Sequence, residues 1–434
     1  MYKIRSLFIL LILLLINAYS PINPFQYSDF DQYQETVSKY EVETKIKKFL
    51  QKDNDIQNYY EVTENELLVF DSAESKNLKN PEFVLRFGNK TKPVLNSFVL
   101  KLQSNKPLQG LKIALDPGHL GGKMAIVENR FIDLILPDEA HTKVHFDEGT
   151  LVTFTAKILK LYLTAAGADV LLTREEPGKA AFNLSFNDWC KQEFGIATDQ
   201  DWTTEETRDI VLNRLNNAPM PLTYKNELIK KLTIIFQESE NKILQLKQTL
   251  FRFCYNQLDL KARSEKINQF HPNLTIIIHL NSSDTVKEIC EADYNLTFVP
   301  GSFLKGDLKD PAARYEFIRL LATDDLEESI RLSQAIAKNM ETTLKIPLQK
   351  SLYMPNDTFF ISPGVYCRNL ALTRRVHSIL CYGESLIQNN AEEAKRLATK
   401  DTNFNGEAVS SRIIEVANAY FKGICEYFGI TANY

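Results

Sequence analysis

The clearest indication of the fold class is the segment Lys112-Ile113-Ala114-Leu115-Asp116-Pro117-Gly118-His119. Its apolar start predicts a short buried strand, and Asp-Pro-Gly predicts the turn that ends the strand. A helix is expected next, over residues 148–165, because apolar residues recur at helical spacing before Gly167. A second strand is expected at 169–174. Strand, helix and strand in this order predict a parallel sheet covered by helices.

The rest of the second half of the chain continues this pattern. Apolar runs predict further strands at 274–279 and 378–382. An amphipathic helix is expected at 326–344 and a last helix at 410–428. We therefore expect an α/β domain over residues 109–434, with a mostly parallel sheet flanked by helices.

Two segments do not fit that alternation. Residues 21–108 contain a helical pattern at 34–52 and strand-like runs at 67–70 and 83–87, which predict a small N-terminal α+β domain. Packing against the main domain is its expected role, and binding of a partner stays open as the alternative. Residues 176–262 are almost wholly helical in pattern and too long for a connection. We expect them to form an inserted helical subdomain.

Composition excludes several classes of protein. The 434 residues carry a formal net charge of −4, which argues against a nucleic-acid binder that works by bulk charge. The six cysteines show no CxxC spacing, so they do not predict a cysteine-based metal site. No P-loop, GxGxxG or GxSxG motif is present, which leaves nucleotide binding and serine hydrolysis without support.

The first twenty residues predict export. Lys3 and Arg5 precede an apolar run at 7–16 that is short for a membrane span. Ala18-Tyr19-Ser20 fits a cleavage site, although Pro21 disfavours the cut, so an uncleaved anchor stays open, as does a buried N-terminal helix. The expected location is the periplasm or cell envelope. The pairing of the cysteines there cannot be predicted.

Four residues with metal-binding or acid–base chemistry fall at the ends of predicted elements. His119 and His279 follow or close strands, Glu384 lies two residues beyond the strand at 378–382, and Glu148 begins a helix. Function in open α/β sheets collects beyond the carboxyl ends of the strands. Two histidines and one carboxylate form a zinc set with a free position for water. A lone histidine at a strand end is more often structural, and it is the joint placement that favours a metal site.

The same residues lie in an ordered series of motifs. The chain resembles the zinc-dependent N-acetylmuramoyl-L-alanine amidases of the Amidase_3 type over about residues 111–428. The matching positions are the DPGH motif at 116–119, Glu148, Thr173-Arg174, Arg263 with Asn268, His279-Leu280-Asn281, and Glu384 with Asn390.

This resemblance implies a fold, an activity and a site. The fold would be amidase/phosphorylase-hydrolase-like, and the reaction would be hydrolysis of the amide bond between N-acetylmuramic acid and L-alanine in peptidoglycan. His119, Glu148 and His279 would hold one zinc per chain, and Glu384 would be the catalytic carboxylate. Asn281 and Arg368 are candidates for binding substrate. Asp116 is a candidate to orient a ligand histidine or to cap its turn.

The chain also departs from the family pattern. The 29 positions from His119 to Glu148 are about twice the usual spacing, and they contain Glu128 as a rival ligand and the pair His141 and His145, for which an exposed loop is the plainer interpretation. Cys381-Tyr382-Gly383 replaces the usual aliphatic approach to the last glutamate. Two alternatives therefore stay open: a zinc peptidase acting on stem-peptide bonds, and an inactive wall-binding or regulatory protein of amidase fold.

A free wall hydrolase outside the membrane endangers the cell that makes it. We therefore expect an element that blocks the site and an activator protein that displaces it. Two segments are candidates for the block. One is residues 300–323, with Arg314, Glu316 and Arg319 available to cover a polar site, and the other is the insertion at 176–262. Arg374 and Arg375 are further candidates to bind a substrate carboxylate, although a solvated charge run is the plainer interpretation, and His377 is expected to be structural.

Overall fold

The computed structural model describes residues 26–93, 106–238, 242–283, 287–352 and 357–430. Its centre is a seven-stranded sheet in the order β10-β11-β9-β12-β8-β4-β7. The strands β4, β7, β8 and β12 run parallel, β9 is antiparallel to β12, and β10 is antiparallel to β11. The bounds are β4 Lys112–Pro117, β7 Asp169–Leu172, β8 Leu274–Asn281, β9 Leu296–Val299, β10 Thr358–Ser362, β11 Val365–Arg368 and β12 Ile379–Ile387. The expected α/β fold with a mostly parallel sheet is thus confirmed.

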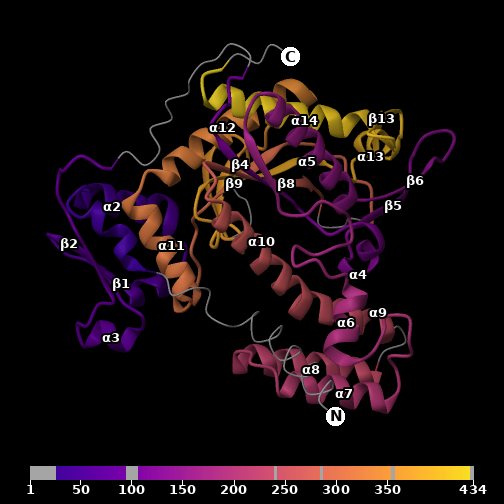
Figure 1. Ribbon diagram of the computed structural model, residues 1–434, viewed down its shortest axis with the longest axis horizontal. Helices are drawn as coiled ribbons and strands as arrows, with labels where there is room; N and C mark the ends of the chain where they lie inside the picture. Colours follow the sequence, from indigo (N-terminus) through magenta and orange to yellow (C-terminus); the bar gives the residue numbers. More distant parts are fainter. Residues whose placement is uncertain (1–25, 94–105, 239–241, 284–286, 353–356, 431–434) are drawn as a thin grey trace.

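Helices cover both faces of this sheet (Figure 1). On one face α5, α12 and α14 pack against each other and against β4, β8 and β12, and their apolar side chains form the largest core of the protein. On the other face α10 lies against β4, where Ile267 joins a smaller core with Ala114, Ile277 and Leu380. The bounds are α5 Glu148–Ala165, α10 Asn256–Phe270, α11 Pro311–Ala322, α12 Asp325–Leu344, α13 Ala391–Ala398 and α14 Ser411–Tyr427. Both faces are therefore buried, as continuous apolar strands require.

The N-terminal segment forms a small unit beside α11, in indigo in Figure 1. It has a three-stranded antiparallel sheet in the order β1-β2-β3. The helix expected at 34–52 begins only at residue 39, because Ser38 caps it by accepting the amide N–H of Glu41. The elements are η1 Tyr27–Tyr33, α2 Lys39–Lys45, η2 Ile46–Leu50, η3 Asn54–Tyr59, β1 Tyr60–Val62, β2 Glu66–Val69, α3 Ala73–Asn77 and β3 Phe83–Arg86.

The α11 segment belongs to the core of this N-terminal unit. Its apolar residues pack with those of the unit in one cluster. Arg314 pairs with Glu82, and Arg319 pairs with Glu316 and Asp325, all partly or fully buried. The prediction that Arg314, Glu316 and Arg319 are available to cover a polar site is therefore wrong, since buried partners already neutralise them.

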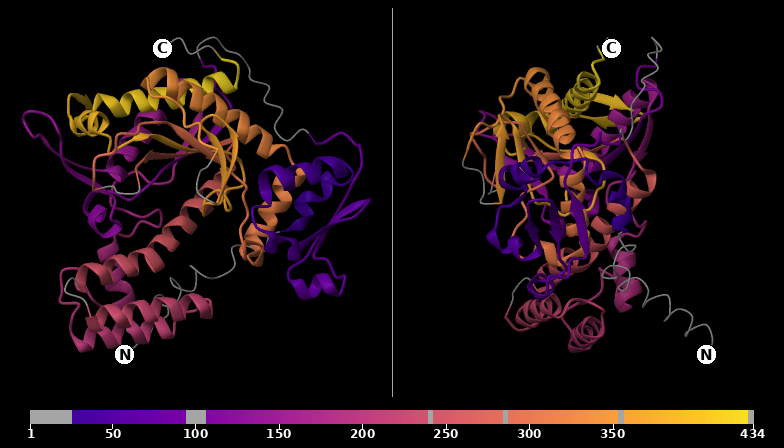
Figure 2. Two further views of the ribbon diagram at one scale, coloured as in Figure 1. Left: turned by 180° about the vertical axis from the view of Figure 1, so that it is seen from behind. Right: turned by 90° about the vertical axis from the view of Figure 1, so that its left-hand side faces the viewer.

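The segment between β7 and β8 is largely helical (Figure 2). Its buried apolar side chains form a core of their own. Trp189 and Trp202 are fully buried in that core, together with Leu120 and Met124 from the loop after β4. Helical structure runs from residue 242 to 270 without a break, so α10 extends beyond residue 262 to reach the main sheet. The elements are α6 Phe186–Phe194, α7 Glu205–Asn216, α8 Leu222–Glu238, α9 Lys242–Leu250 and η5 Phe251–Tyr255.

The loop after β4 is itself structured. It forms a turn of 3-10 helix, the short helix α4 and a β-hairpin whose second strand leads into α5. The elements are η4 Gly122–Met124, α4 Ala125–Glu128, β5 Phe131–Ile135 and β6 Lys143–Asp147. A last hairpin and a short turn complete the described elements, which are η6 Asp307–Lys309, β13 Thr402–Phe404 and β14 Glu407–Val409.

The export signal or anchor expected at 1–20 lies outside the described residues. Among the helices that the structure does describe, none is both long enough and apolar enough to cross a membrane.

Candidate metal centre

Three elements bring His119, Glu148 and His279 together. His119 lies two residues beyond the end of β4, and His279 lies near the carboxyl end of the neighbouring parallel strand β8. Glu148 is the first residue of α5, whose start is fixed because Asp147 accepts the amide N–H of Thr150 at 2.7 Å. The carboxyl ends of two adjacent strands and a helix N-terminus thus meet at one edge of the sheet.

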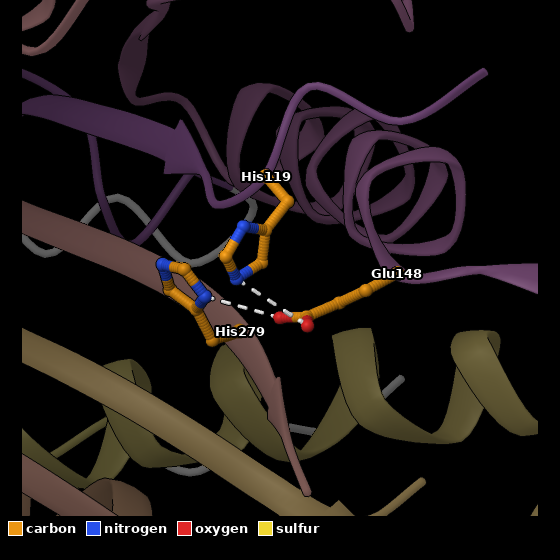
Figure 3. Close-up of side chains that lie close together, drawn as sticks. All are labelled: His119, Glu148 and His279. Carbon is orange, nitrogen blue, oxygen red and sulfur yellow. Dashed lines mark hydrogen bonds and ion pairs between the residues drawn. The ribbon is translucent and has the colours of Figure 1, made fainter. Parts of the chain in front are cut away.

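The three side chains point toward one another (Figure 3). The Glu148 carboxylate lies between the two rings, 3.0 Å from His279 Nδ1 and 3.4 Å from His119 Nε2. One donor atom from each residue lies within 4.8 Å of the other two, which is the arrangement of a metal site. Two imidazoles and one carboxylate are the ligands of many zinc sites that keep a position open for water.

Glu148 is held in its ionised form. It is almost fully buried, and its oxygens accept the amide N–H of Leu280 at 3.1 Å and the side-chain amide of Gln388 at 3.0 Å. Burial opposes ionisation, but the charge of His119 and the hydrogen bonds from His279 and Gln388 outweigh it and lower the pKa of Glu148 to about 2. The carboxylate is therefore ready to bind a cation at neutral pH.

His119 is oriented by Glu128. The Glu128 carboxylate lies 2.8 Å from His119 Nδ1 and also accepts the amide N–H of Leu120 at 2.9 Å. Burial disfavours a charged imidazole, but the Glu148 and Glu128 carboxylates outweigh burial and raise the pKa of His119. Glu128 thus lies behind the ring, on the side away from Glu148, and not within the cluster of three donors.

His279 is enclosed on all sides. Its Nε2 lies 2.8 Å from the Tyr382 hydroxyl, and the two rings stack with centroids 4.7 Å apart. Burial lowers the pKa of His279 to about 4, so the ring is neutral at physiological pH. Gly118 borders the same ring, and a Cβ at that position would lie 2.6 Å from His279 Nδ1. The glycine of the DPGH stretch is therefore needed for the close approach of β8's histidine.

Glu384 lies inside β12 and not beyond its end, because the parallel pairing with β8 continues to Ile387. It is paired across the strands with His279, so both side chains point to the same face of the sheet. Burial, and then repulsion from Glu148, raise the pKa of Glu384 to about 8. The sequence-based position two residues past the strand was wrong, but Glu384 does lie beside the cluster.

A buried charge network fixes the loop that carries His119. Asp116 is fully buried and accepts hydrogen bonds from Arg263 Nε at 2.8 Å and from the Thr173 hydroxyl at 2.5 Å. Arg174 donates to the carbonyl oxygens of residues 117–119. The sequence suggested that Asp116 orients a histidine or caps its own turn. It instead accepts its hydrogen bonds from Arg263 and Thr173. Its position beside the Arg263 of α10 makes it the anchor of the loop.

The other candidates have different surroundings. Asn281 accepts the amide N–H of Ser282, and Arg368 pairs with Asp357 at 3.1 Å while its guanidinium lies over the Phe298 ring. The Arg368 charge opposes the rise in the pKa of Glu384, so Arg368 lies near the site. Arg374 donates to Asn369. Substrate binding by Asn281 and Arg368 stays a prediction.

The two loop histidines do not approach the cluster. His145 lies on the exposed side of β6, opposite Asp133, and His141 lies in the turn of that hairpin with positive φ. They occupy an exposed hairpin, in agreement with the plainer interpretation. His377 is partly buried, and its ring lies tilted against that of Tyr315 with centroids 4.9 Å apart, as a structural residue does.

Two residues of the site were not predicted from the sequence. Gln388 holds Glu148 from 240 positions away, and Tyr382 holds His279 from 103 positions away. Tyr382 carried a signal, because it departs from the aliphatic approach to Glu384. Gln388 carried none, since a glutamine after a strand is not unusual.

Fold and site together define an α/β protein with a histidine–glutamate–histidine cluster at the carboxyl edge of its sheet. Neither a protein-family model nor a curated protein matches the chain. Solved structures of N-acetylmuramoyl-L-alanine amidases do match it, each over 74% of this chain.

Three of these structures illustrate the level of similarity. They are the CwlD amidase of Clostridioides difficile in complex with the GerS lipoprotein (17% identity, 98% of that chain, TM-score 0.35), Ami1 of Mycobacterium smegmatis (12%, 98%, 0.38) and the catalytic domain of CwlV from Bacillus (Paenibacillus) polymyxa var. colistinus (13%, 99%, 0.34). Identity at this level does not carry over an activity, so the function has to follow from the residues of the site.

Proposed function

We propose that this protein is a zinc-dependent amidase that hydrolyses the bond between N-acetylmuramic acid and L-alanine in peptidoglycan. The observation that carries the proposal is the convergence of His119, Glu148 and His279, with Glu384 paired beside His279 on the next strand. The choice of bond is supported by the ordered motifs around these residues.

The donor set fits zinc. His279 is neutral and Glu148 is ionised, which are the forms that bind a metal. Glu128 and Tyr382 contact the far nitrogens of the two imidazoles, as the outer partners of metal-binding histidines do. Zinc bound by His119, Glu148 and His279 would polarise the amide carbonyl and acidify a water.

The remaining chemistry belongs to Glu384. Its raised pKa in the metal-free protein reflects burial and the nearby Glu148 carboxylate, and a bound cation would favour its ionised form. As a carboxylate it would accept a proton from the attacking water and pass it to the leaving amine of L-alanine. The products are a free lactyl carboxylate and a free amino group on the stem peptide.

Digestion of purified muropeptides by the zinc-loaded protein tests this proposal. Mass spectrometry should find intact glycan with a free lactyl carboxyl group and a released stem peptide that begins with L-alanine. New termini within the stem peptide would instead identify a zinc peptidase. No cleavage by zinc-loaded protein, together with retention on peptidoglycan, would identify an inactive wall-binding protein.

The location of the protein in the cell and its division into domains are part of the same proposal. Residues 1–20 would export the protein to the periplasm or cell envelope, with 7–16 as an anchor where the signal is not cut. Residues 21–108 would form the N-terminal domain and 109–434 the catalytic domain, with the helical insertion at 176–262. An activator protein would act on the insertion, since the α11 segment is already buried against the N-terminal unit.

A further inference from the structure

Tyr382 contacts His279 with both its ring and its hydroxyl. The residue lies on β12, two positions before Glu384 and on the same face of the sheet. The rings are nearly parallel, 9° apart, and the hydroxyl oxygen lies 2.8 Å from Nε2. Phe298 of β9 packs against the other side of the tyrosine with centroids 6.1 Å apart. The Tyr382 ring, which Phe298 holds in place, therefore fixes the imidazole of His279 in one orientation.

The opposite nitrogen of His279 determines what the hydroxyl must do. Nδ1 lies 3.0 Å from the ionised Glu148 carboxylate, which can only accept, so Nδ1 carries the hydrogen in the metal-free protein. Nε2 then has a free lone pair and accepts the hydrogen of the Tyr382 hydroxyl. A metal that takes the Nδ1 lone pair reverses this pattern, because the hydrogen of the neutral ring must then lie on Nε2.

A phenol hydroxyl can serve both states. It donates to a bare Nε2 and accepts from Nε2–H by rotation of its own hydrogen, whereas a carboxylate or backbone carbonyl can only accept. The ring stays neutral throughout, and its hydrogen changes from one nitrogen to the other. The Tyr382 hydroxyl keeps its hydrogen, because a phenol is an un-ionised donor and acceptor at neutral pH.

We propose that Tyr382 is a positioning residue that fixes the His279 ring and pairs with Nε2 in both tautomers, which frees Nδ1 to bind the metal. This inference rests on the metal site proposed above. It gives a physical role to the Cys381-Tyr382-Gly383 departure. Gly383 leaves room for the Tyr420 hydroxyl of α14, which a Cβ at that position would overlap.

Zinc affinity tests the role of the hydroxyl. Tyr382→Phe keeps the stacked ring and removes only the oxygen, and its zinc dissociation constant is measured by competition with a chelator. We expect it to rise about 10-fold to 100-fold, the effect of losing an outer partner of a metal-binding histidine. Tyr366→Phe is the matched control, because Tyr366 is buried and its hydroxyl donates to the Ser351 carbonyl away from the cluster. Equal affinities of parent and Tyr382→Phe would overturn the inference.

Nitrogen-15 spectra of the His279 ring in the parent protein test the tautomers directly. The metal-free protein should carry the ring hydrogen on Nδ1, and the zinc-loaded protein should carry it on Nε2. A hydrogen on Nε2 without metal, or zinc on Nε2, would overturn the inference.

These spectra also separate the inference from the proposed function. A parent protein that binds no zinc refutes the proposed zinc site. In that case the metal-free spectrum decides for Tyr382: the Nε2 shift should change in Tyr382→Phe and not in Tyr366→Phe, and an unchanged shift would overturn its role.

Discussion

Glu128 contacts the far side of His119: its carboxylate lies 2.8 Å from Nδ1, while Nε2 of the same ring faces Glu148 at 3.4 Å. The contact depends on α4, which turns the chain back toward β4 within nine residues and ends at Glu128. The same carboxylate accepts the amide N–H of Leu120, so it binds both the ring and the loop that carries it. In the proposed zinc site, Glu148 is therefore a ligand and Glu128 is an outer partner of His119.

The first prediction separates these two carboxylates by zinc binding. Glu148→Gln should lose stoichiometric zinc, because an amide replaces an ionised ligand. Glu128→Gln should keep one zinc per chain with an affinity about 10-fold to 100-fold lower, because His119 loses its orienting partner. Metal analysis after dialysis gives the content, and chelator competition gives the affinity. Glu139→Gln is the control, since Glu139 is exposed on the same loop.

The opposite pattern would identify Glu128 as the ligand. A Glu128→Gln protein without zinc, beside a Glu148→Gln protein that retains it, would move the site toward the loop.

The second prediction concerns the catalytic role proposed for Glu384. Glu384→Gln should fold normally and keep zinc, and it should lose at least about 100-fold in the rate of muropeptide cleavage, the scale for loss of a general base. The substitution keeps the shape of the side chain but removes its ability to accept a proton. The rate of cleavage is measured at saturating substrate, and the zinc content is measured on the same samples. Turnover close to that of the parent would exclude this role for Glu384.

The third prediction concerns the buried network under the His119 loop. Asp116→Asn removes the charge that neutralises Arg263, whose next carboxylate, Asp259, lies 3.7 Å away. Breaking a buried pair in this way typically lowers the free energy of unfolding by about 3–5 kcal/mol. Urea denaturation measures the loss. Asp199→Asn, at an exposed position, should change it by less than about 0.5 kcal/mol. A loss for Asp116→Asn no larger than that of the control would show that the network adds nothing.

The sheet and the positions of His119, Glu148 and His279 could be predicted because their signals in the sequence are local. Buried parallel strands are continuous apolar runs, and their carboxyl ends meet at one edge, which placed His119 and His279 together. β9 has a similarly apolar sequence, Leu-Thr-Phe-Val, but was not predicted. The end of β12 was placed too early, because Gly383, Glu384 and Ser385 interrupt its apolar pattern.

The partners of the site residues could not be predicted, because they depend on contacts between distant segments. Glu148 and Gln388 are 240 positions apart, and Asp116 and Arg263 are 147 positions apart. The long loop after His119 gave no sign that α4 would return Glu128 to the ring. The N-terminal unit packs with α11 through a shared apolar core, and nothing in the sequence pairs those two segments.

The fourth prediction is a pH dependence of stability that originates at Asp293. Its carboxylate accepts the amide N–H of Ile387 at 2.9 Å, at the end of β12. Burial raises the pKa of Asp293 from 3.8 to about 6, against the opposing effect of the Ile387 hydrogen bond. The folded protein therefore holds this proton more tightly than the unfolded chain does. The resulting stabilisation is complete below about pH 4 and is lost as the pH rises through about 6.

Asp293→Asn removes this dependence, because asparagine stays neutral and its side-chain oxygen can still accept from Ile387. At about pH 4 the variant and the parent should have similar free energies of unfolding. By about pH 8 the variant should be the more stable one, by at most about 3 kcal/mol, which is the energy equivalent of the difference between 3.8 and about 6. Urea denaturation of both proteins across this pH range gives the difference, with Asp199→Asn as a control that should show no trend. If Asp293→Asn is instead the less stable protein at pH 8, the ionised carboxylate stabilises the end of β12, and the sign of the shift assigned to Asp293 is wrong.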